Sequence, residues 1–305
     1  MKTIKIKSPA KINIGLKVVG KRADGYHDIE TIFQMIDLCD DIVLTESAGA
    51  ITLHSDNKDI PTDEKNLAYR AAKLLRDRTG VDKGVRIEIG KHIPISAGLG
   101  GGSSNAAAAL LGLNYIWDLG LSKDELLPTA KSIGADVPLF LSCPRAMGTG
   151  RGDELQTLPV KSKFYVILLN PRLHISTEWV YRNLKLELTK NKNDIRIIKF
   201  MFERDEIEKA ASLMFNDLES VVTEKYSVIA DMKEALLSAG AAGSSMSGSG
   251  STVFGIFKDY PSAEKAVESL KLVPAVSKQG HEKWTLFLAE NITGLHEVYP
   301  REVIV

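Results

Sequence analysis

Apolar and polar residues alternate along most of the first third of the chain, which is the pattern of half-buried β-strands. The strands that this alternation predicts are 3–7, 10–19, 30–37, 41–46, 51–55 and 85–89. The segment RADGYHD at 22–28 interrupts the pattern and is typical of a turn or loop. Residues 66–79 instead carry leucines and alanines at helical spacing, so one helix is expected among these strands.

Helical spacing dominates the rest of the chain. A helix over about 103–118 is followed by one that a capping box of Ser122 and Glu125 opens and Gly134 ends. Further helices are predicted at 177–186, 193–203, 206–220, 228–239 and 262–271, and further strands at 164–171, at the end of the glycine-serine segment 243–257, and at 284–290. Because strands and helices do not alternate regularly, the pattern favours α+β layers over a doubly wound parallel sheet.

The length and composition of the chain predict two domains. Its 305 residues are 44% hydrophobic, which is enough for a large core and for about two domains. Prolines and glycines cluster over residues 144–163, and we expect the boundary near 155–163. The N-terminal domain would then cover 1–158 and the C-terminal domain 159–305, although no clear pattern is visible from about residue 292 onward.

The charge balance argues against large polyanionic partners. Lys+Arg and Asp+Glu both number 39, so no net field favours nucleic acid or an anionic membrane. The chain has no long apolar segment that could serve as a signal peptide or cross a membrane. Cys39 and Cys143 are the only cysteines and cannot build a structural zinc site alone. Having only two cysteines suits a reducing cytoplasm, where we expect this protein to act on small molecules only. We expect it to be a monomer or a weak homodimer.

The segment PISAGLGGGSSNAAAA at 94–109 is the clearest chemical signal in the sequence. Its glycines allow backbone N–H groups to approach a ligand, and the alanine-rich helix that follows directs unpaired N–H groups to the same place. Together they predict a phosphate-binding loop. The segment lacks the lysine of a P-loop and the last glycine of a dinucleotide fingerprint. The competing interpretation is a flexible loop before an ordinary helix.

Phosphoryl transfer needs bound phosphates, a cation and a group that orients or deprotonates the acceptor hydroxyl. Ser103 and Ser104 can bind phosphate or Mg²⁺ through their hydroxyls, or simply cap the helix. Lys11 shares one face of its strand with Asn13, although a lysine on a strand is more often a solvated outward residue. Asp136 in GADVPLF can accept a hydroxyl proton or cap the next helix. A carboxylate held beside an ammonium group stays ionised, but the sequence does not show that the two meet.

Two further loops have both a functional and a structural interpretation. Tyr26 and His27 can stack on and hydrogen-bond a ring, or they can belong to a packed turn. The second glycine-serine loop, Gly243 to Ser251, offers more N–H donors for an anion, or is a plain hairpin connection.

Three separated segments resemble the motifs of the GHMP kinases, a family that includes galactokinase, homoserine kinase and mevalonate kinase. They are SPAKINIGLKV near the N-terminus, PISAGLGGGSSNAAAA in the centre and SSMSGSGSTVFGIF toward the C-terminus. The segments DGYH, GADVPLFL, AMGTGRGDEL and PTDEKNLAYRAA make the match closer to one branch, whose substrate carries a cytidine diphosphate group. The resemblance covers residues 1 to about 290.

The resemblance implies a two-domain α+β fold with the active site between the domains. It also implies transfer of the γ-phosphoryl group of ATP, with Mg²⁺, to a hydroxyl of a cytidine-diphosphate-linked sugar alcohol in the non-mevalonate route to isoprenoid precursors. Asp136 would be the base or the group that orients the hydroxyl, and Lys11 would hold it ionised. Asn13 would contact the substrate near the reacting hydroxyl.

By the same resemblance, the cytosine lies between Tyr26 and Tyr181, with His27 making polar contacts. Asn66 and Leu67 fall near the adenine pocket, and Ser104 is a tentative Mg²⁺ ligand. The residues expected around the ATP phosphates are Pro94, Ile95, Ser96, Ala97, Gly98, Leu99, Gly100, Gly101, Gly102, Ser103 and Ser104. A kinase for another small alcohol and a nucleotide-binding module without catalysis remain the alternatives.

Overall fold

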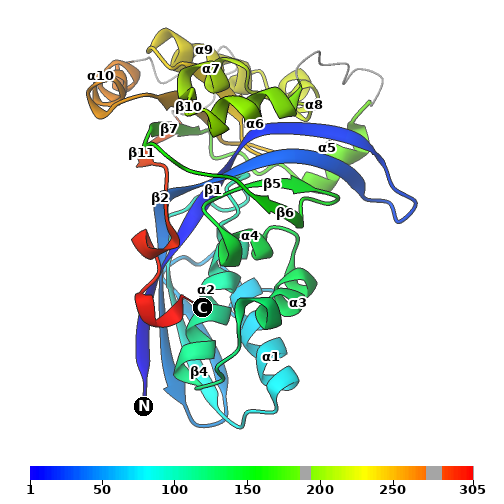
Figure 1. The fold of residues 1–305 in the computed structure, drawn as a ribbon, viewed down its shortest axis with the longest axis vertical. Helices are drawn as coiled ribbons and strands as arrows, with labels where there is room; N and C mark the ends of the chain where they lie inside the picture. Colours follow the sequence, from blue (N-terminus) through cyan, green and yellow to red (C-terminus); the bar gives the residue numbers. More distant parts are fainter. Residues whose placement is uncertain (186–193, 273–283, 305) are drawn as a thin grey trace.

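The computed structural model describes residues 1–185, 194–272 and 284–304 (Figure 1). The fold is α+β, as expected, with two sheets and helices packed on both. In the described part of the chain, the larger sheet has seven strands and the smaller has four. Within the described residues no helix is both long and apolar enough to cross a membrane.

Two long antiparallel strands form the centre of the larger sheet. They are β1 (Thr3–Lys21) and β2 (His27–Ser47), and each was expected as two shorter strands. Neither strand ends where a break was expected, because the chain stays paired in the sheet at these points. At the break expected before Ala10, the pairing register shifts at Pro9/Ala10 instead. A β-bulge of this kind bends a strand without ending it. Both strands extend from the half covered by α2 (Gly101–Ile116) to the half covered by α6 (Ile195–Glu203) (Figure 1).

The remaining strands of the larger sheet are short. Its order is β3-β4-β2-β1-β8, with β5 paired to β2 and β6 to β5. The bounds are β3 Ile51–Ser55, β4 Gly84–Gly90, β5 Arg145–Thr149, β6 Glu154–Thr157 and β8 Phe215–Asn216. The strands predicted at 51–55 and 85–89 are confirmed within a residue at each end.

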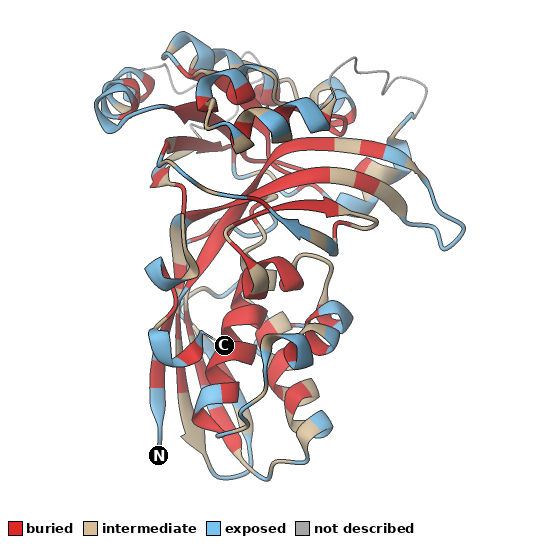
Figure 2. Cartoon of the chain, viewed as in Figure 1, coloured by how far each residue is buried: buried red, intermediate tan, exposed pale blue. Residues whose placement is uncertain are grey.

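Four of the described helices lie on one side of this sheet, with α3 packed on the other three: α1 (Leu67–Thr79), α2 (Gly101–Ile116), α3 (Lys123–Ile133) and α4 (Val137–Ser142). Helix α2 is buried on nearly all sides, and Figure 2 shows it inside the N-terminal half. A Cβ at Gly112 would lie 2.3 Å from Leu44 Cδ1, so a larger residue there would have to displace the buried Leu44 side chain. The capping box of Ser122 and Glu125 at the start of α3 is confirmed.

The smaller sheet has the order β11-β7-β10-β9. Its strands are β7 Tyr165–Asn170, β9 Gly243–Met246, β10 Val253–Phe257 and β11 Thr285–Glu290. The helices of this half are α5 Thr177–Asn183, α6 Ile195–Glu203, α7 Ile207–Ser212, α8 Glu219–Lys225, α9 Val228–Ser238 and α10 Tyr260–Lys271. The predicted glycine-serine loop therefore begins as a strand, and only its centre forms the turn.

The single helix predicted over 206–220 is wrong. The chain instead forms α7, the two-residue strand β8 and α8, because Phe215 and Asn216 leave the helix to pair in parallel with Gly15 and Leu16 of β1. The side chain of Asn216 then donates hydrogen bonds to the carbonyl oxygens of Met246 at 2.8 Å and Gly248 at 2.7 Å.

The segment after β11 returns to the N-terminal half (Figure 1). Its buried side chains, Ile292, Val298, Tyr299 and Val303, join the core between the larger sheet and α2. The hydroxyl of Tyr299 donates a hydrogen bond to the carbonyl oxygen of Phe140 in α4 at 3.0 Å. The boundary expected near 155–163 overlaps the end of β6 and lies before β7, and the described residues that follow it contribute to the cores of both halves.

Candidate active site

A cavity of about 1270 Å³ lies between the two halves of the chain. The N-terminal half contributes β1, the glycine loop and the residues that join α3 to α4. The C-terminal half contributes the segment 174–178, part of α5 and the turn after β9. Many of the predicted site residues line this cavity: Lys11, Asn13, Tyr26, His27, Ser96, Gly98, Gly100, Ser103, Asp136 and Tyr181.

The glycine loop is held against β1 and the β9–β10 hairpin. The backbone N–H of Lys11 donates to the carbonyl oxygen of Leu99 at 2.9 Å. The hydroxyl of Ser247 donates to the carbonyl oxygen of Gly98 at 2.8 Å. Gly98 and Gly100 have φ angles of 77° and 69°, which favour glycine. The interpretation as a freely flexible loop is therefore wrong, because hydrogen bonds fix this backbone to its neighbours.

The second glycine-serine loop is a hairpin turn that also reaches the cavity. Gly248 and Ser249 line it, and a Cβ at Gly248 would lie 3.5 Å from Lys11 Nζ. The backbone N–H of Asn13 donates to the hydroxyl of Ser247 at 3.3 Å. The hairpin interpretation is thus confirmed, and its turn borders the same space as the first loop.

Lys11 is buried, with 4% of its surface exposed, so its interpretation as a solvated strand residue is wrong. Its ammonium donates to Asn13 Oδ1 at 2.6 Å and lies 3.6 Å from Asp136 Oδ2. The same ammonium lies 5.4 Å from the ring centre of Phe33, which gives it a favourable cation–π contact. The expected meeting of Lys11 and Asp136 is therefore present in the structure.

Asp136 occupies the N-cap position of α4, but its side chain makes no capping hydrogen bond. The carboxylate is 31% exposed and faces the cavity beside Lys11. Asp136 therefore does not serve as a side-chain cap of α4. Its carboxylate lies where a substrate hydroxyl could reach it, and it stays close to the ammonium group of Lys11.

Aromatic side chains gather in another part of the cavity. His27 and Tyr181 are stacked, with ring centres 5.0 Å apart and an interplanar angle of 27°. The guanidinium of Arg151 lies 5.4 Å from the ring centre of Tyr26, which is 59% exposed. Burial, with a smaller effect from Lys21, holds the pKa of His27 below its usual value. Burial also raises the pKa of the Tyr181 hydroxyl, so that it stays protonated.

Some predicted residues do not reach this cavity. Ser104 is fully buried, and its hydroxyl accepts a hydrogen bond from Ser8 at 2.8 Å, so Ser103 is the serine that faces the cavity. Asn66 caps α1 by accepting from the N–H of Ala68 at 2.9 Å. Leu67 lies beside Gly102, where a Cβ would be 3.7 Å from its Cδ1. Within the described ranges, no three acidic, histidine or cysteine side chains stand together as a ready metal site.

The sequence did not identify three polar residues that position this site. Thr31 accepts from the Asn13 amide at 2.8 Å and donates to the carbonyl oxygen of Gly15 at 2.7 Å, which orients Asn13. Asn216 holds the turn at Gly248. Glu219 accepts from the N–H of Met246 at 2.6 Å and pairs with Lys233. None carries a local signal, since each matters through a partner distant in sequence.

Two family models match this chain. Residues 66–143 match the GHMP kinases N terminal domain, and residues 201–274 match the GHMP kinases C terminal model. The first range contains α1, the glycine loop, α2 and Asp136, and the second contains the turn at Gly248. The matched ranges therefore include parts of both walls of the cavity.

Similar proteins cover nearly the whole chain. The 4-diphosphocytidyl-2-C-methyl-D-erythritol kinase of Syntrophotalea carbinolica is 43% identical over 93% of this chain and 98% of its own length. That of Acetivibrio thermocellus is 40% identical over 96% and 100%. The crystal structure of a 4-(cytidine 5'-diphospho)-2C-methyl-D-erythritol kinase superposes with a TM-score of 0.77 at 31% identity, over 95% of this chain and 100% of that one. The chain therefore belongs to the GHMP kinases and, within them, to the family of the 4-diphosphocytidyl-2-C-methyl-D-erythritol kinases.

Proposed function

We propose that this protein transfers the γ-phosphoryl group of ATP to the 2-hydroxyl of 4-diphosphocytidyl-2-C-methyl-D-erythritol. The products are the 2-phosphate and ADP, and the reaction is a step of the non-mevalonate route to isoprenoid precursors. The observation that carries the proposal is the pairing of Lys11 with Asp136 at 3.6 Å, in a cavity bordered by the glycine loop and by the His27–Tyr181 stack.

In the proposed reaction, the acceptor oxygen bonds to the γ-phosphorus while the bond from that phosphorus to the bridging oxygen of ADP breaks. The hydroxyl proton passes to the carboxylate of Asp136 and from there to solvent. Because the transition state is loose, the proton leaves late, and Asp136 contributes largely by orienting the hydroxyl. Lys11 supplies positive charge beside the acceptor oxygen, and the hydrogen bond to Asn13 fixes its direction.

The glycine loop and the N-terminus of α2 would hold the phosphates of ATP. Helix α2 begins at Gly101 and spans 16 residues, so its first N–H groups and its dipole both favour an anion there. Ser103 in the first turn adds a hydroxyl that faces the cavity. Gly248 brings the second loop to within reach of Lys11, which limits the space left for water around the transferred group.

The aromatic side chains would bind the cytosine. The ring centres of His27 and Tyr181 are 5.0 Å apart, which is a direct stacking distance and leaves no room for a base between them. The base would therefore bind against Tyr181 on the side away from His27, with the exposed ring of Tyr26 closing over it. Holding His27 neutral gives the imidazole both a donor and an acceptor for the polar edge of the base.

We further propose that the reaction uses Mg²⁺ and takes place in the cytoplasm with small-molecule partners only. Mg²⁺ commonly keeps several waters and binds substrate phosphates together with one or two protein oxygens. The Ser103 hydroxyl, which lines the cavity, would supply one such oxygen. When bound, the ion neutralises charge on the transferred phosphate.

The decisive experiment is coupled ADP release from Mg²⁺-ATP with 4-diphosphocytidyl-2-C-methyl-D-erythritol, mevalonate, homoserine and galactose in parallel. The proposal requires activity with the first alcohol alone. Activity with another alcohol would retain the kinase but overturn the cytosine-binding roles of Tyr26, His27 and Tyr181. ATP binding without turnover of any alcohol would instead indicate a nucleotide-binding module.

A further inference from the structure

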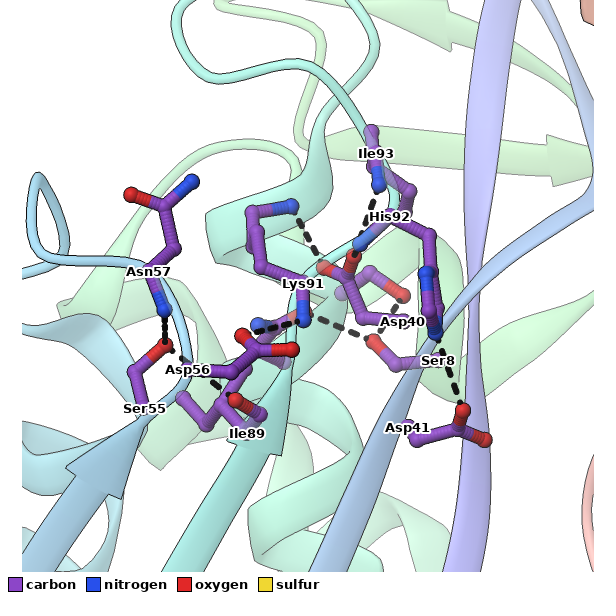
Figure 3. Close-up of polar contacts among 12 residues, drawn as sticks. Ser8, Asp40, Asp41, Ser55, Asp56, Asn57, Ile89, Lys91, His92 and Ile93 are labelled. Atoms are coloured by element: carbon purple, nitrogen blue, oxygen red, sulfur yellow. Dashed lines mark hydrogen bonds and ion pairs between the residues drawn. The ribbon is translucent and has the colours of Figure 1, made fainter.

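A buried ion pair lies at the entrance of the glycine loop, outside the cavity described above (Figure 3). The side chain of Asp40 in β2 is fully buried, and that of Lys91 is 5% exposed. Lys91 Nζ donates to Asp40 Oδ2 at 2.6 Å. The other carboxylate oxygen accepts from the backbone N–H groups of His92 and Ile93, each at 2.8 Å. Asp40 therefore binds three consecutive residues.

These three residues lead directly into the glycine loop and touch the start of α2. A Cβ at Gly101, the first residue of α2, would lie 3.1 Å from Lys91 Nζ and 3.2 Å from Ile93 Cγ2. An ammonium group is unfavourable at this end of a helix, because the helix dipole is positive there. The carboxylate of Asp40 supplies the charge that lets Lys91 occupy this place.

The neighbouring strand β1 also holds the first turn of α2, at the sheet position that pairs with Asp40. Ser8 of β1 pairs with Asp40 of β2 in the sheet register, and the two lie close together in Figure 3. The hydroxyl of Ser8 bonds to Ser104 Oγ at 2.8 Å and to Asn105 Oδ1 at 2.9 Å. The paired residues Ser8 and Asp40 therefore hold both ends of the loop. Asp40 holds its entrance, and Ser8 holds the start of the helix that follows.

We infer that Asp40 is a positioning residue for the nucleotide, which acts by fixing Lys91, His92 and Ile93 so that the glycine loop and α2 keep their phosphate-binding geometry. The inference rests on the proposed function, since it assigns the loop to ATP. It predicts that replacing Asp40 lowers the affinity for the nucleotide and does not change the affinity for the alcohol, because the contacts of Asp40 reach the loop and not the Lys11–Asp136 pair.

The test is steady-state kinetics of the full chain with Asp40→Asn, together with calorimetric binding of a non-hydrolysable ATP analogue. Asparagine keeps an oxygen for the backbone N–H groups but leaves the Lys91 ammonium buried without its countercharge. We expect KM for ATP and Kd for the analogue to rise by about tenfold or more, because small misplacements of binding groups carry large penalties. KM for the alcohol should remain at the wild-type value.

Asp41→Asn is the matched control. Asp41 is the next residue, and its carboxylate lies 3.1 Å from His92 Nε2, but it is 46% exposed and bonds no backbone N–H of the loop entrance that the structure describes. This variant should keep the wild-type KM for ATP. Backbone hydrogen exchange of residues 92–103 in the protein without nucleotide should accelerate in Asp40→Asn and stay unchanged in Asp41→Asn.

The double variant Asp40→Asn, Lys91→Met separates positioning from stability. Removing both charges eliminates the buried, unpaired ammonium group, so Tm should recover while the affinity for the ATP analogue stays low. If the affinity recovers together with Tm, or if Asp40→Asn binds the analogue as the wild type does, Asp40 is only a stabilising residue and the inference is overturned. A wild-type chain that binds the analogue but phosphorylates no alcohol would overturn the proposed function and leave this test intact.

Discussion

The carbonyl oxygen of Gly98 accepts a hydrogen bond of 2.8 Å from the hydroxyl of Ser247, so the two glycine-containing loops meet at one backbone position. A Cβ at Gly98 would lie 2.0 Å from the carbonyl oxygen of Ser247, and the φ angle of Gly98 is 77°. Both the close approach and the backbone conformation require glycine. The contact joins the two halves of the chain beside the proposed phosphate site.

Replacing Gly98 with alanine should therefore separate the loops. We expect Gly98→Ala to lower kcat/KM for ATP by about 100-fold, because displacement of catalytic groups by an ångström has that effect. Gly120→Ala is the control, since Gly120 has a φ of 64° but no atom within 4 Å of its Cβ position. If Gly98→Ala kept the same kcat/KM for ATP as Gly120→Ala, the close contact between the two loops would not be needed for activity, and the prediction would be wrong.

Asp136→Asn should reduce kcat severely and leave nucleotide affinity intact. An amide cannot take the hydroxyl proton and orients the hydroxyl less strongly, so the loss should be about 100-fold to 10,000-fold. Calorimetry with an ATP analogue should give the wild-type Kd. Glu178→Gln is the control, because this carboxylate lines the cavity but pairs with Arg182 instead of Lys11.

Lys11→Met and Asp136→Asn should be strongly non-additive. The two groups lie 3.6 Å apart and act on the same hydroxyl, so the second substitution should cost little once the first is present. A double-mutant cycle on kcat measures this coupling. Additive losses would mean that Lys11 and Asp136 act independently, and the proposed shared role would then be wrong.

Tyr181→Ala should weaken binding of the cytidine-containing substrate. Stacking on an aromatic side chain contributes about 1–3 kcal/mol per base, which corresponds to a rise in Kd of about fivefold to 150-fold. Titration with cytidine diphosphate, monitored by calorimetry, measures it. Tyr165→Ala removes a tyrosine of β7 that is stacked edge-on with Tyr260 and does not line the cavity, and should leave this Kd unchanged.

The ionisation of His27 predicts an acid-dependent loss of stability. Folding holds the pKa of His27 below its usual 6.5, because burial and Lys21 disfavour the charged ring. The unfolded chain therefore binds a proton first as the pH falls, so stability decreases from near pH 6.5 until the lower folded pKa is passed. Tm of His27→Gln should fall less over this interval than Tm of the wild type. Parallel curves for the two proteins would contradict the prediction.

Tyr299→Phe should lower the free energy of unfolding by about 1 kcal/mol, which is typical for the loss of one buried hydrogen bond. The lost bond is the one from the Tyr299 hydroxyl to the carbonyl oxygen of Phe140. Urea denaturation measures the change, with Tyr115→Phe as a control on a 38% exposed tyrosine. Because α4 begins beside Asp136, a change in kcat larger than the stability loss explains would show that the bond also orients the carboxylate.

The sequence was most informative where the chemistry is local. Alternation of apolar residues correctly predicts β3 and β4, and the Ser122–Glu125 capping box marks the start of α3. The glycine loop is also recognisable, since glycines before a helix suit an anion whatever the surrounding fold. These features depend on neighbours within a few residues.

Features that depend on distant partners could not be predicted in this way. A lysine on a strand is expected to face solvent, and only the tertiary fold buries Lys11 and places it beside Asp136, 125 positions later in the chain. Helical spacing over 206–220 does not show that Asn216 leaves the helix to bond the turn at Gly248. Ser104 likewise resembled a ligand in the sequence, but Ser8 binds its hydroxyl.

The return of residues 292–304 to the first half of the molecule has a consequence for synthesis. The side chains of Ile292, Val298, Tyr299 and Val303 complete the core that the larger sheet and α2 begin. A growing polypeptide leaves the ribosome from its N-terminus, and domains commonly fold in that order. Here the core of the first half closes only after residues 292–304 have been added, when all the described elements of the second half have already been synthesised. Until then the nascent chain exposes apolar surface, which makes this interval the one in which a chaperone has most to protect.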